Sequence, residues 1–304
     1  MSWWGNLSRG RKIVWSIAFV YVVGLIGFAV GFGIKGHKNE SFKVIDSFHL
    51  ESWFKIAGPL QFDKGVLYLL LATIITLGIM LYVASHMQKR PGRLQVAVEA
   101  AYGLMLQVTR DNMSDKLRKR WFPVIFTLFI FILVSNLIGY IPLPVDSQNT
   151  FKLFGADIPS FQIYAAVTNL AVPLVLALGV FIAYNVEGVR AHGAVGYIKS
   201  LIPKGVGGPM LILIFPLEML SNFVLRPLSL TIRLWANLLA GHLLIDFMAG
   251  SLAVLLGLQL LGWLTLPLGV ILYLFEAVLI AGLQAFIFAI LTAIYIGGAS
   301  AASH

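Results

Sequence analysis

Cysteine is absent from the 304 residues, which excludes disulfides, thiolate catalysis, and zinc or iron–sulfur sites held by cysteine. Charge is scarce as well, since only 12% of residues are Asp, Glu, Lys or Arg, against roughly a quarter in soluble domains. The sequence contains no HExxH pair, no Walker A loop and no G-x-S-x-G elbow. These absences argue against a soluble enzyme, a disordered chain and a nucleic-acid-binding domain. No metal or cofactor is expected.

Long apolar runs dominate the sequence. Hydrophobic residues make up 59% of the chain, and several runs exceed the roughly 18 apolar residues that a membrane-spanning helix needs. We therefore predict an all-α, polytopic integral membrane protein in which 1–304 is a single membrane domain. Four predicted spans are 13–34, 65–85, 121–141 and 158–186, and the apolar C-terminal third adds two more, giving about six membrane-embedded helices.

One segment is amphipathic rather than wholly apolar. Within 94–110, the polar residues Gln95, Glu99 and Gln107 fall four or eight positions apart and so share one helix face. We expect this helix to lie along the membrane surface. The run 13–34, which follows a basic start, is either an extra span or a signal-like segment.

The Lys and Arg residues predict the orientation in the membrane. Fourteen of the 22 fall in segments that the layout places inside, and six fall in segments that it places outside. This bias follows the rule that cytoplasmic loops are rich in Lys and Arg. The remaining two, Arg226 and Arg233, lie in apolar surroundings.

From Gly205 to His304 the chain carries only five charged residues. A charged side chain at the bilayer centre costs about 2.5–3.5 kcal/mol even on a lenient scale, so each needs a partner, water or a function. The charged residues are Glu218, Arg226, Arg233, Asp246 and Glu276, and the polar residues near them are Asn237, His242 and Gln284.

Arg233 is the hardest of these to explain as structural. It lies within 210–245, which as one helix would be about 54 Å long, against a hydrocarbon core of about 30 Å. This helix must therefore tilt steeply or break, at Pro216 or Pro227. Arginine keeps its positive charge even when half-buried, so Arg233 suits an electrostatic gate better than a proton carrier.

The neighbouring residues His242, Glu218 and Glu276 can take up and release protons. His242 and Asp246 are four positions apart on one helix face and could form a short relay. Arg233 and His242 are nine positions apart, about 180° around a helix. A gate and a relay on this helix would therefore face different sides.

The segment around Arg233 strongly resembles a motif of one known family. The segment 226–242, RPLSLTIRLWANLLAGH, is similar to the arginine motif of subunit a of the F-type ATP synthase, the membrane stator of a proton-driven rotor. Segment 283–295 resembles the final helix of that family. Segment 136–142 resembles its span-ending motif, and 48–51 resembles its outer N-terminal segment.

The resemblance implies that 210–296 is a tilted helical hairpin that wraps a ring of c subunits, with Arg233 facing the ring carboxylates. Two aqueous half-channels would end on either side of this arginine. His242 and Glu276 would line the outer half-channel, and Glu218 the inner one. Supporting polar roles would fall to Asn237, Gln284, Asn136, Asn169 and Arg226.

The resemblance also implies partners and a location. The chain would assemble with the c-ring, the peripheral-stalk subunit b and the rest of the ATP synthase, within a lipid bilayer. It would conduct H⁺, with Na⁺ left open, and would carry no nucleotide site, so it is not an enzyme on its own. The lack of cysteine and the plain basic start favour a bacterial plasma membrane, with the mitochondrial inner membrane or the thylakoid as alternatives.

The sequence departs from the family pattern in three places. Glu276 lies eight residues before Gln284, where the family usually has seven, and one residue is about 100° on a helix. The residue before Asn169 is Thr168, where the family often has an aspartate. Asp246, in contrast, is an acidic residue that the family usually lacks. The run 13–34 is the third departure.

Two other functions and several structural roles stay open from the residues alone. A proton-coupled secondary transporter would use a buried Arg/Glu/His relay without a ring partner, and a polytopic scaffold would use Arg233 only as a structural partner. Arg226 could reach the head-group layer, Asp246 could lie near the outer surface, and His242 could be a hydrogen-bonded core histidine.

Overall fold

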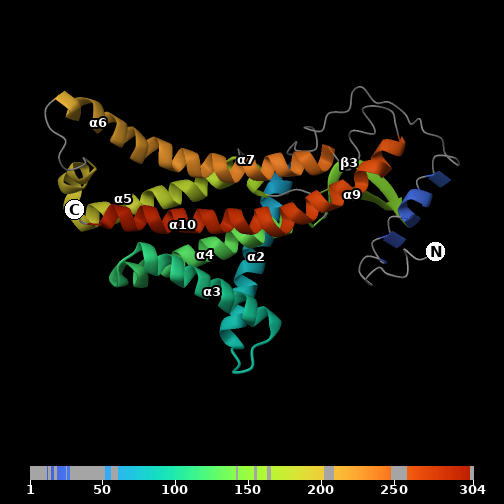
Figure 1. Cartoon of the computed structure of the whole chain (residues 1–304), viewed down its shortest axis with the longest axis horizontal. Helices are drawn as coiled ribbons and strands as arrows, with labels where there is room; N and C mark the ends of the chain where they lie inside the picture. The colour runs from blue at the N-terminus through green and yellow to red at the C-terminus, as the bar shows by residue number, and fades with distance from the viewer. Residues whose placement is uncertain are drawn as a thin grey trace. The chain divides into compact units, whose positions relative to one another are not determined.

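Helices make up most of the computed structural model (Figure 1). It describes residues 12, 15–16, 19–24, 26–27, 52–55, 61–141, 143–153, 156–162, 166–201, 209–247 and 259–301. Most of the predicted run 13–34, and all of 48–51, lie outside these residues. The chain divides into two compact units, Met1–His49 with Gly241–Phe275, and Leu50–Ala240 with Glu276–His304.

The predicted polytopic helical membrane fold is confirmed. Within the described residues, five helices are long and apolar enough to cross a bilayer. The α-helices are α2 (Lys64–Ser85), α3 (Arg93–Asn112), α4 (Asp115–Gly139), α5 (Ala171–Ser200), α6 (Pro209–Leu220), α7 (Arg226–Asp246), α9 (Gln259–Phe275) and α10 (Ala281–Ser300). The short turns are η2 (Ala166–Thr168), a 3₁₀ turn, and η3 (Ser221–Leu225) and η5 (Glu276–Ile280), which are π-turns.

The third and fourth spans begin and end at different residues from those predicted. α4 starts at Asp115 and so includes the basic residues before Trp121. α5 starts at Ala171 rather than at 158 and continues to Ser200, beyond the predicted end at 186. A kink at Gly193, which has a φ of 70°, interrupts α5, and glycine adopts this φ at little cost.

Two short antiparallel hairpins, which the sequence analysis did not predict, lie in the connections. The first joins β1 (Ser52–Lys55) to β2 (Gln61–Asp63), immediately before α2. The second joins β3 (Leu143–Leu153) to β4 (Ala156–Gln162), between α4 and η2. The second hairpin occupies the first residues of the predicted span 158–186, which is why the helix there starts late.

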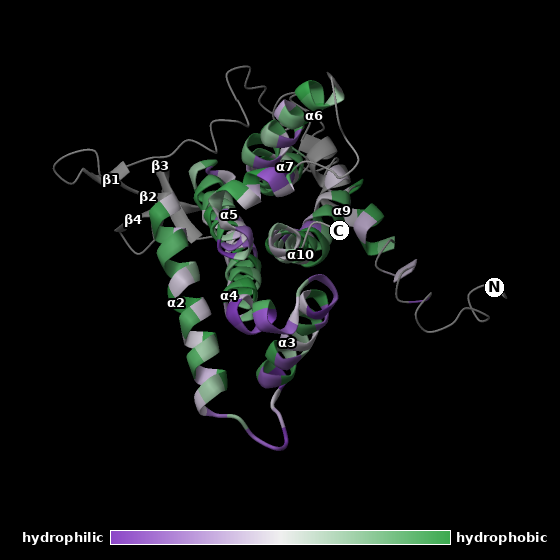
Figure 2. Cartoon of the chain, turned by 90° about the vertical axis from the view of Figure 1, so that its left-hand side faces the viewer, coloured by the Kyte–Doolittle hydropathy of each residue, from purple (hydrophilic) through white to green (hydrophobic). Residues whose placement is uncertain are grey.

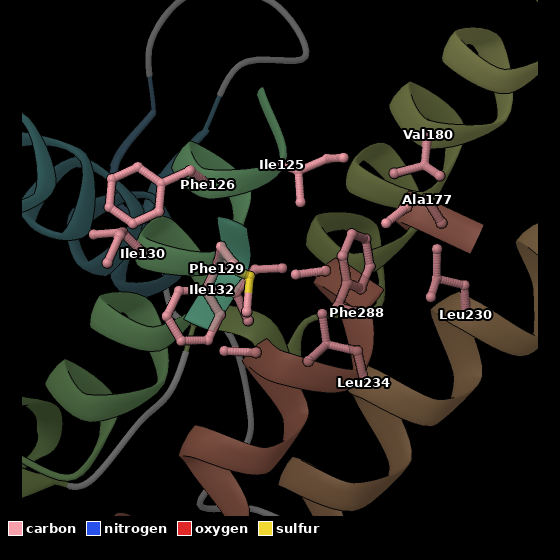
Figure 3. Close-up of a cluster of buried hydrophobic side chains, with 14 of the residues drawn as sticks. Ile125, Phe126, Phe129, Ile130, Ile132, Ala177, Val180, Leu230, Leu234 and Phe288 are labelled. Atoms are coloured by element: carbon pink, nitrogen blue, oxygen red, sulfur yellow. The ribbon is translucent and has the colours of Figure 1, made fainter. Parts of the chain in front are cut away.

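The core of the larger unit lies where α4, α5 and α10 pack together (Figures 1 and 3). Phe288 of α10 lies between α4 and α5, and Leu230 and Leu234 approach it from α7 (Figure 3). Small residues recur every four positions along the buried face of α10, and such stripes let helices approach closely in membranes. They are Ala281, Ala285, Ala289, Ala293 and Gly297.

The helices α2 and α3 differ in hydropathy as the sequence predicts. Figure 2 shows α2 hydrophobic along most of its length, whereas hydrophilic residues gather on α3 and in the connections before and after it. Met105 and Val108 of α3 are buried, while Leu94 and Leu104 are exposed. The apolar face of α3 is thus only partly covered by the described chain.

Candidate functional site

α7 presents two different faces over the residues that belong to the larger unit. Leu230, Leu234 and Leu238 follow one another at four-residue spacing and are almost completely buried. Four-residue spacing keeps side chains on one helix face. Arg233 lies on another face and is exposed, and Asn237, one turn later, is exposed as well. The three leucines therefore anchor α7 and direct Arg233 away from the core.

Arg233 makes no hydrogen bond or ion pair with any residue in the described part of the chain. Its nearest neighbours along its own helix face, Ser229 and Asn237, are exposed too. Apolar side chains such as Leu228 and Ile232 are also exposed beside it. A permanent cation is thus presented on a largely apolar surface.

Arg226, which the sequence analysis left open as a head-group contact, has partners within the chain. Its Nη1 donates to Oδ1 of Asn222 at 2.8 Å, and its guanidinium carbon lies 5.4 Å from the ring centre of Tyr295. Nδ2 of Asn222 in turn donates to the Tyr197 hydroxyl at 3.0 Å, and that hydroxyl donates to Oδ1 of Asn185 at 3.1 Å. This polar chain ties α7 to α5 and α10.

Met210–Ile245 forms one continuous 36-residue helix. It does not break at either proline. Pro216 lies within α6, and the π-turn η3 ends immediately before Arg226 and Pro227. A proline cannot donate a backbone hydrogen bond and its ring displaces the preceding turn, and a π-turn is one way for a helix to relieve this. Glu218 is half-buried, one turn before Asn222.

A second helix of the hairpin carries two further predicted residues. Glu276 opens the π-turn η5 and is 3% exposed, and Gln284 lies on α10 and is 4% exposed. Asn136 of α4 is fully buried, and its Nδ2 donates to the carbonyl oxygen of Ala281 at 3.3 Å. Asn136 therefore contacts the backbone directly after the π-turn.

The remaining predicted residues are distributed between the two units. His242 is 2% exposed and belongs, with Asp246, to the smaller unit. The side chain of Asp246 lies outside the described residues, although its backbone ends α7. Oδ1 of Asn169 accepts a hydrogen bond from the backbone N–H of Ala171, the first residue of α5, at 3.0 Å.

Sequence reasoning missed a buried carboxylate, Glu187. Its two oxygens accept hydrogen bonds from Nη1 of Arg120 at 2.9 and 3.1 Å, and one of them also accepts from Nε1 of Trp121 at 3.1 Å. Nη1 of Arg190 lies 3.8 Å away. Glu187, Arg120 and Arg190 line a cleft of about 420 Å³ at the start of α4. The sequence signal that could have revealed Glu187 is an acidic residue in a helix-forming run, with basic residues earlier in the chain.

Metal binding finds no support in the described residues, where no three His, Asp or Glu side chains lie close enough to share an ion.

Comparison with known proteins matches residues 66–297 to the family described as ATP synthase A chain. ATP synthase subunit a of Bradyrhizobium diazoefficiens is 39% identical over 86% of this chain and 98% of its own length. The corresponding subunits of Rhodopseudomonas palustris and a Nocardioides species are 34% and 36% identical, over 86% and 79% of this chain and 98% and 83% of theirs. The chain therefore belongs to the ATP synthase A chain family, that of subunit a in the membrane sector of F-type ATP synthases.

Proposed function

We propose that this chain is the proton-conducting stator of a rotary ATP synthase and that Arg233 is its gate. A proton would enter from outside, neutralise a carboxylate of the c-ring, and leave inside after the ring has turned. Arg233 would favour the ionised carboxylate and would repel protons and cations that could otherwise leak between the two half-channels. The driving force is about 2.3 kcal/mol per charge per 100 mV.

The observation that carries this proposal is the exposure of Arg233 among exposed apolar side chains such as Leu228 and Ile232. Within a bilayer a permanent cation needs a counter-charge, water or backbone carbonyls, and Arg233 has no hydrogen-bond or ion-pair partner among the described residues. A carboxylate on a partner subunit would meet this need. A purely structural arginine would instead have partners such as those that Arg226 has.

The two half-channels would use titratable groups carried by the helical segments Met210–Ile245 and Pro267–Ser300. We assign His242 and Glu276 to the outer half-channel and Glu218 to the inner one, because these residues can exchange protons. Asp246 would assist His242, which lies four positions earlier on the same helix. Asn237 and Gln284 would hydrogen-bond near the gate.

The partners and location follow from the same proposal. The exposed apolar side chains of the helix Met210–Ile245, including Leu213, Leu217 and Leu225, would lie against the c-ring. Subunit b would contact other faces of the chain. The three relatives named above come from bacteria, so we place the complex in a bacterial plasma membrane.

ATP-driven acidification of inverted vesicles tests the gate. Arg233→Ala should lower the rate at least tenfold while the complex still co-purifies, because the ring carboxylate loses its counter-charge. Arg190→Ala removes another exposed arginine, one with only a 3.8 Å contact, and should pump normally. His242→Ala should slow pumping less completely than Arg233→Ala.

Two outcomes would count against the proposal. Normal pumping by an assembled Arg233→Ala complex would make the arginine structural. Pumping that requires Na⁺ at constant pH would show that sodium, rather than the proton, is the coupling ion.

A further inference from the structure

The π-turn η5 interrupts the long C-terminal helix at a specific place. It spans Glu276–Ile280, between α9 and α10, within the continuous span Pro267–Ser300. A π-turn inside an α-helix accommodates one extra residue. The extra residue therefore falls between Glu276 and Gln284, the two buried polar side chains on this helix that the proposed function uses.

The angular position of Glu276 depends on this extra residue. Eight residues at about 100° each would place Glu276 about 80° away from Gln284 around an uninterrupted α-helix. When the π-turn absorbs one of them, seven α-helical steps remain, about 20° short of two full turns. Glu276 then lies on the same face as Gln284, about 10 Å along the axis.

The burial of the side chains agrees with the second geometry. In an uninterrupted α-helix, Glu276 would point in the same direction as Leu283 and Ile294, within about 20°. Those two side chains are 47% and 41% exposed, whereas Glu276 is 3% exposed, close to the 4% of Gln284. Within the π-turn the most exposed residue is Val278, at 75%, and Leu279 beside it is 52% exposed.

A hydrogen bond from another helix holds the end of the π-turn. Nδ2 of Asn136 donates to the carbonyl oxygen of Ala281, the first residue of α10, at 3.3 Å. Both residues are fully buried. This contact fixes the rotation of α10 against α4 at the residue where the α-helical geometry resumes.

We propose that η5 is a register element that keeps the Glu276 carboxylate on the face of Gln284, and that Asn136 is the positioning residue that stabilises it. This inference rests on the proposed function, since the shared face matters for transport only if Glu276 lines the proton path. The π-turn makes the eight-residue spacing from Glu276 to Gln284 equivalent, in direction, to seven residues of regular α-helix.

Single-residue deletion separates the two geometries. Deletion of Val278 should convert η5 to α-helix without rotating Glu276 relative to Gln284, so ATP-driven pumping should stay within about twofold of the parent. Insertion of one alanine after Val278 should rotate Glu276 by about 100° and lower pumping at least tenfold. Deletion of Ile294, an exposed apolar residue where α10 is regular, is the matched control and should impair assembly.

Coupling between Asn136 and the π-turn tests the positioning role. Asn136→Ala should lower pumping several-fold in the parent but less than twofold in the chain that lacks Val278, because a regular helix does not need this anchor. A residue that merely stabilises packing would lower pumping equally in both.

The outcomes distinguish the register inference from the function on which it rests. If Glu276→Gln and deletion of Val278 both abolish pumping in assembled complexes, Glu276 acts in transport but the register inference is overturned. If Glu276→Gln pumps normally, the proposed role of Glu276 fails. The register inference is then judged from the thiol reactivity of Glu276→Cys and Gln284→Cys, each of which is the only cysteine in its variant chain. Unchanged reactivity at both sites after deletion of Val278 supports the register inference. Reactivity that changes at one site alone overturns it.

Discussion

Removing the Glu187 carboxylate should loosen the contact between α4 and α5. Its side chain is 8% exposed and accepts hydrogen bonds from Arg120 and Trp121. Breaking a fully buried ion pair costs about 3–5 kcal/mol. Arg120 is 49% exposed, so water can solvate it once Glu187 is gone and the loss is smaller. We expect Glu187→Ala to destabilise the chain by about 2–3 kcal/mol, and Glu187→Gln by less.

Thermal dissociation of this chain from the detergent-solubilised complex measures the effect. A loss of this size should lower the midpoint by about 4 °C or more. A double-variant cycle with Arg120→Gln and Glu187→Gln isolates the pair, because contacting residues are non-additive by about 0.5–3 kcal/mol. If the two variants add to within about 0.5 kcal/mol, the ion pair contributes nothing and the reasoning is refuted.

Two further predictions concern close approaches between segments. Gly297→Ala should destabilise the chain by about 1–3 kcal/mol, because its new Cβ would meet the backbone carbonyl of Asn112. Gly298→Ala places its Cβ in open space and should be neutral or stabilising. Equal thermal midpoints for the two variants would contradict this prediction. Trp235→Phe removes the Nε1–H that donates to the Thr168 carbonyl at 2.9 Å and should cost about 0.5–1.5 kcal/mol. Its pumping rate after assembly should match the parent, and a tenfold loss would place Trp235 in the transport path instead.

The sequence predicts most of the fold but few of the helix ends. Hydropathy follows the composition of a run, so α2 lies within one residue of the range 65–85. Hydropathy cannot detect partners, and for this reason the sequence did not single out Glu187, although Arg120 and Trp121 pair with it inside the structure. The hairpin that ends at Gln162 could not be told from the apolar helix that follows.

In the candidate site, too, the sequence shows which residues are unusual but not how packing orients them. Arg233 and Glu276 are visible in the sequence because a charge within an apolar run is a local signal. The rotation of Glu276 is not visible, because the sequence shows neither the π-turn that begins at Glu276 nor the contact of Asn136 with Ala281. Spacing alone therefore identifies Glu276 as a candidate but leaves its direction open by about 100° around the helix axis.

The two arginines of α7 show how neighbours decide what a charge can do. Arg226 and Arg233 are seven positions apart, so the two side chains leave the helix within about 20° of each other. Arg226 has the Asn222 amide and the Tyr295 ring as partners, whereas Arg233 has exposed neighbours and stays available to another subunit. Because the helix is continuous between them, anchoring Arg226 also fixes the direction of Arg233. Arg226→Gln should accordingly lower stability and leave the direction of Arg233 less well defined, whereas Arg233→Gln should remove the proposed gate and leave the fold intact.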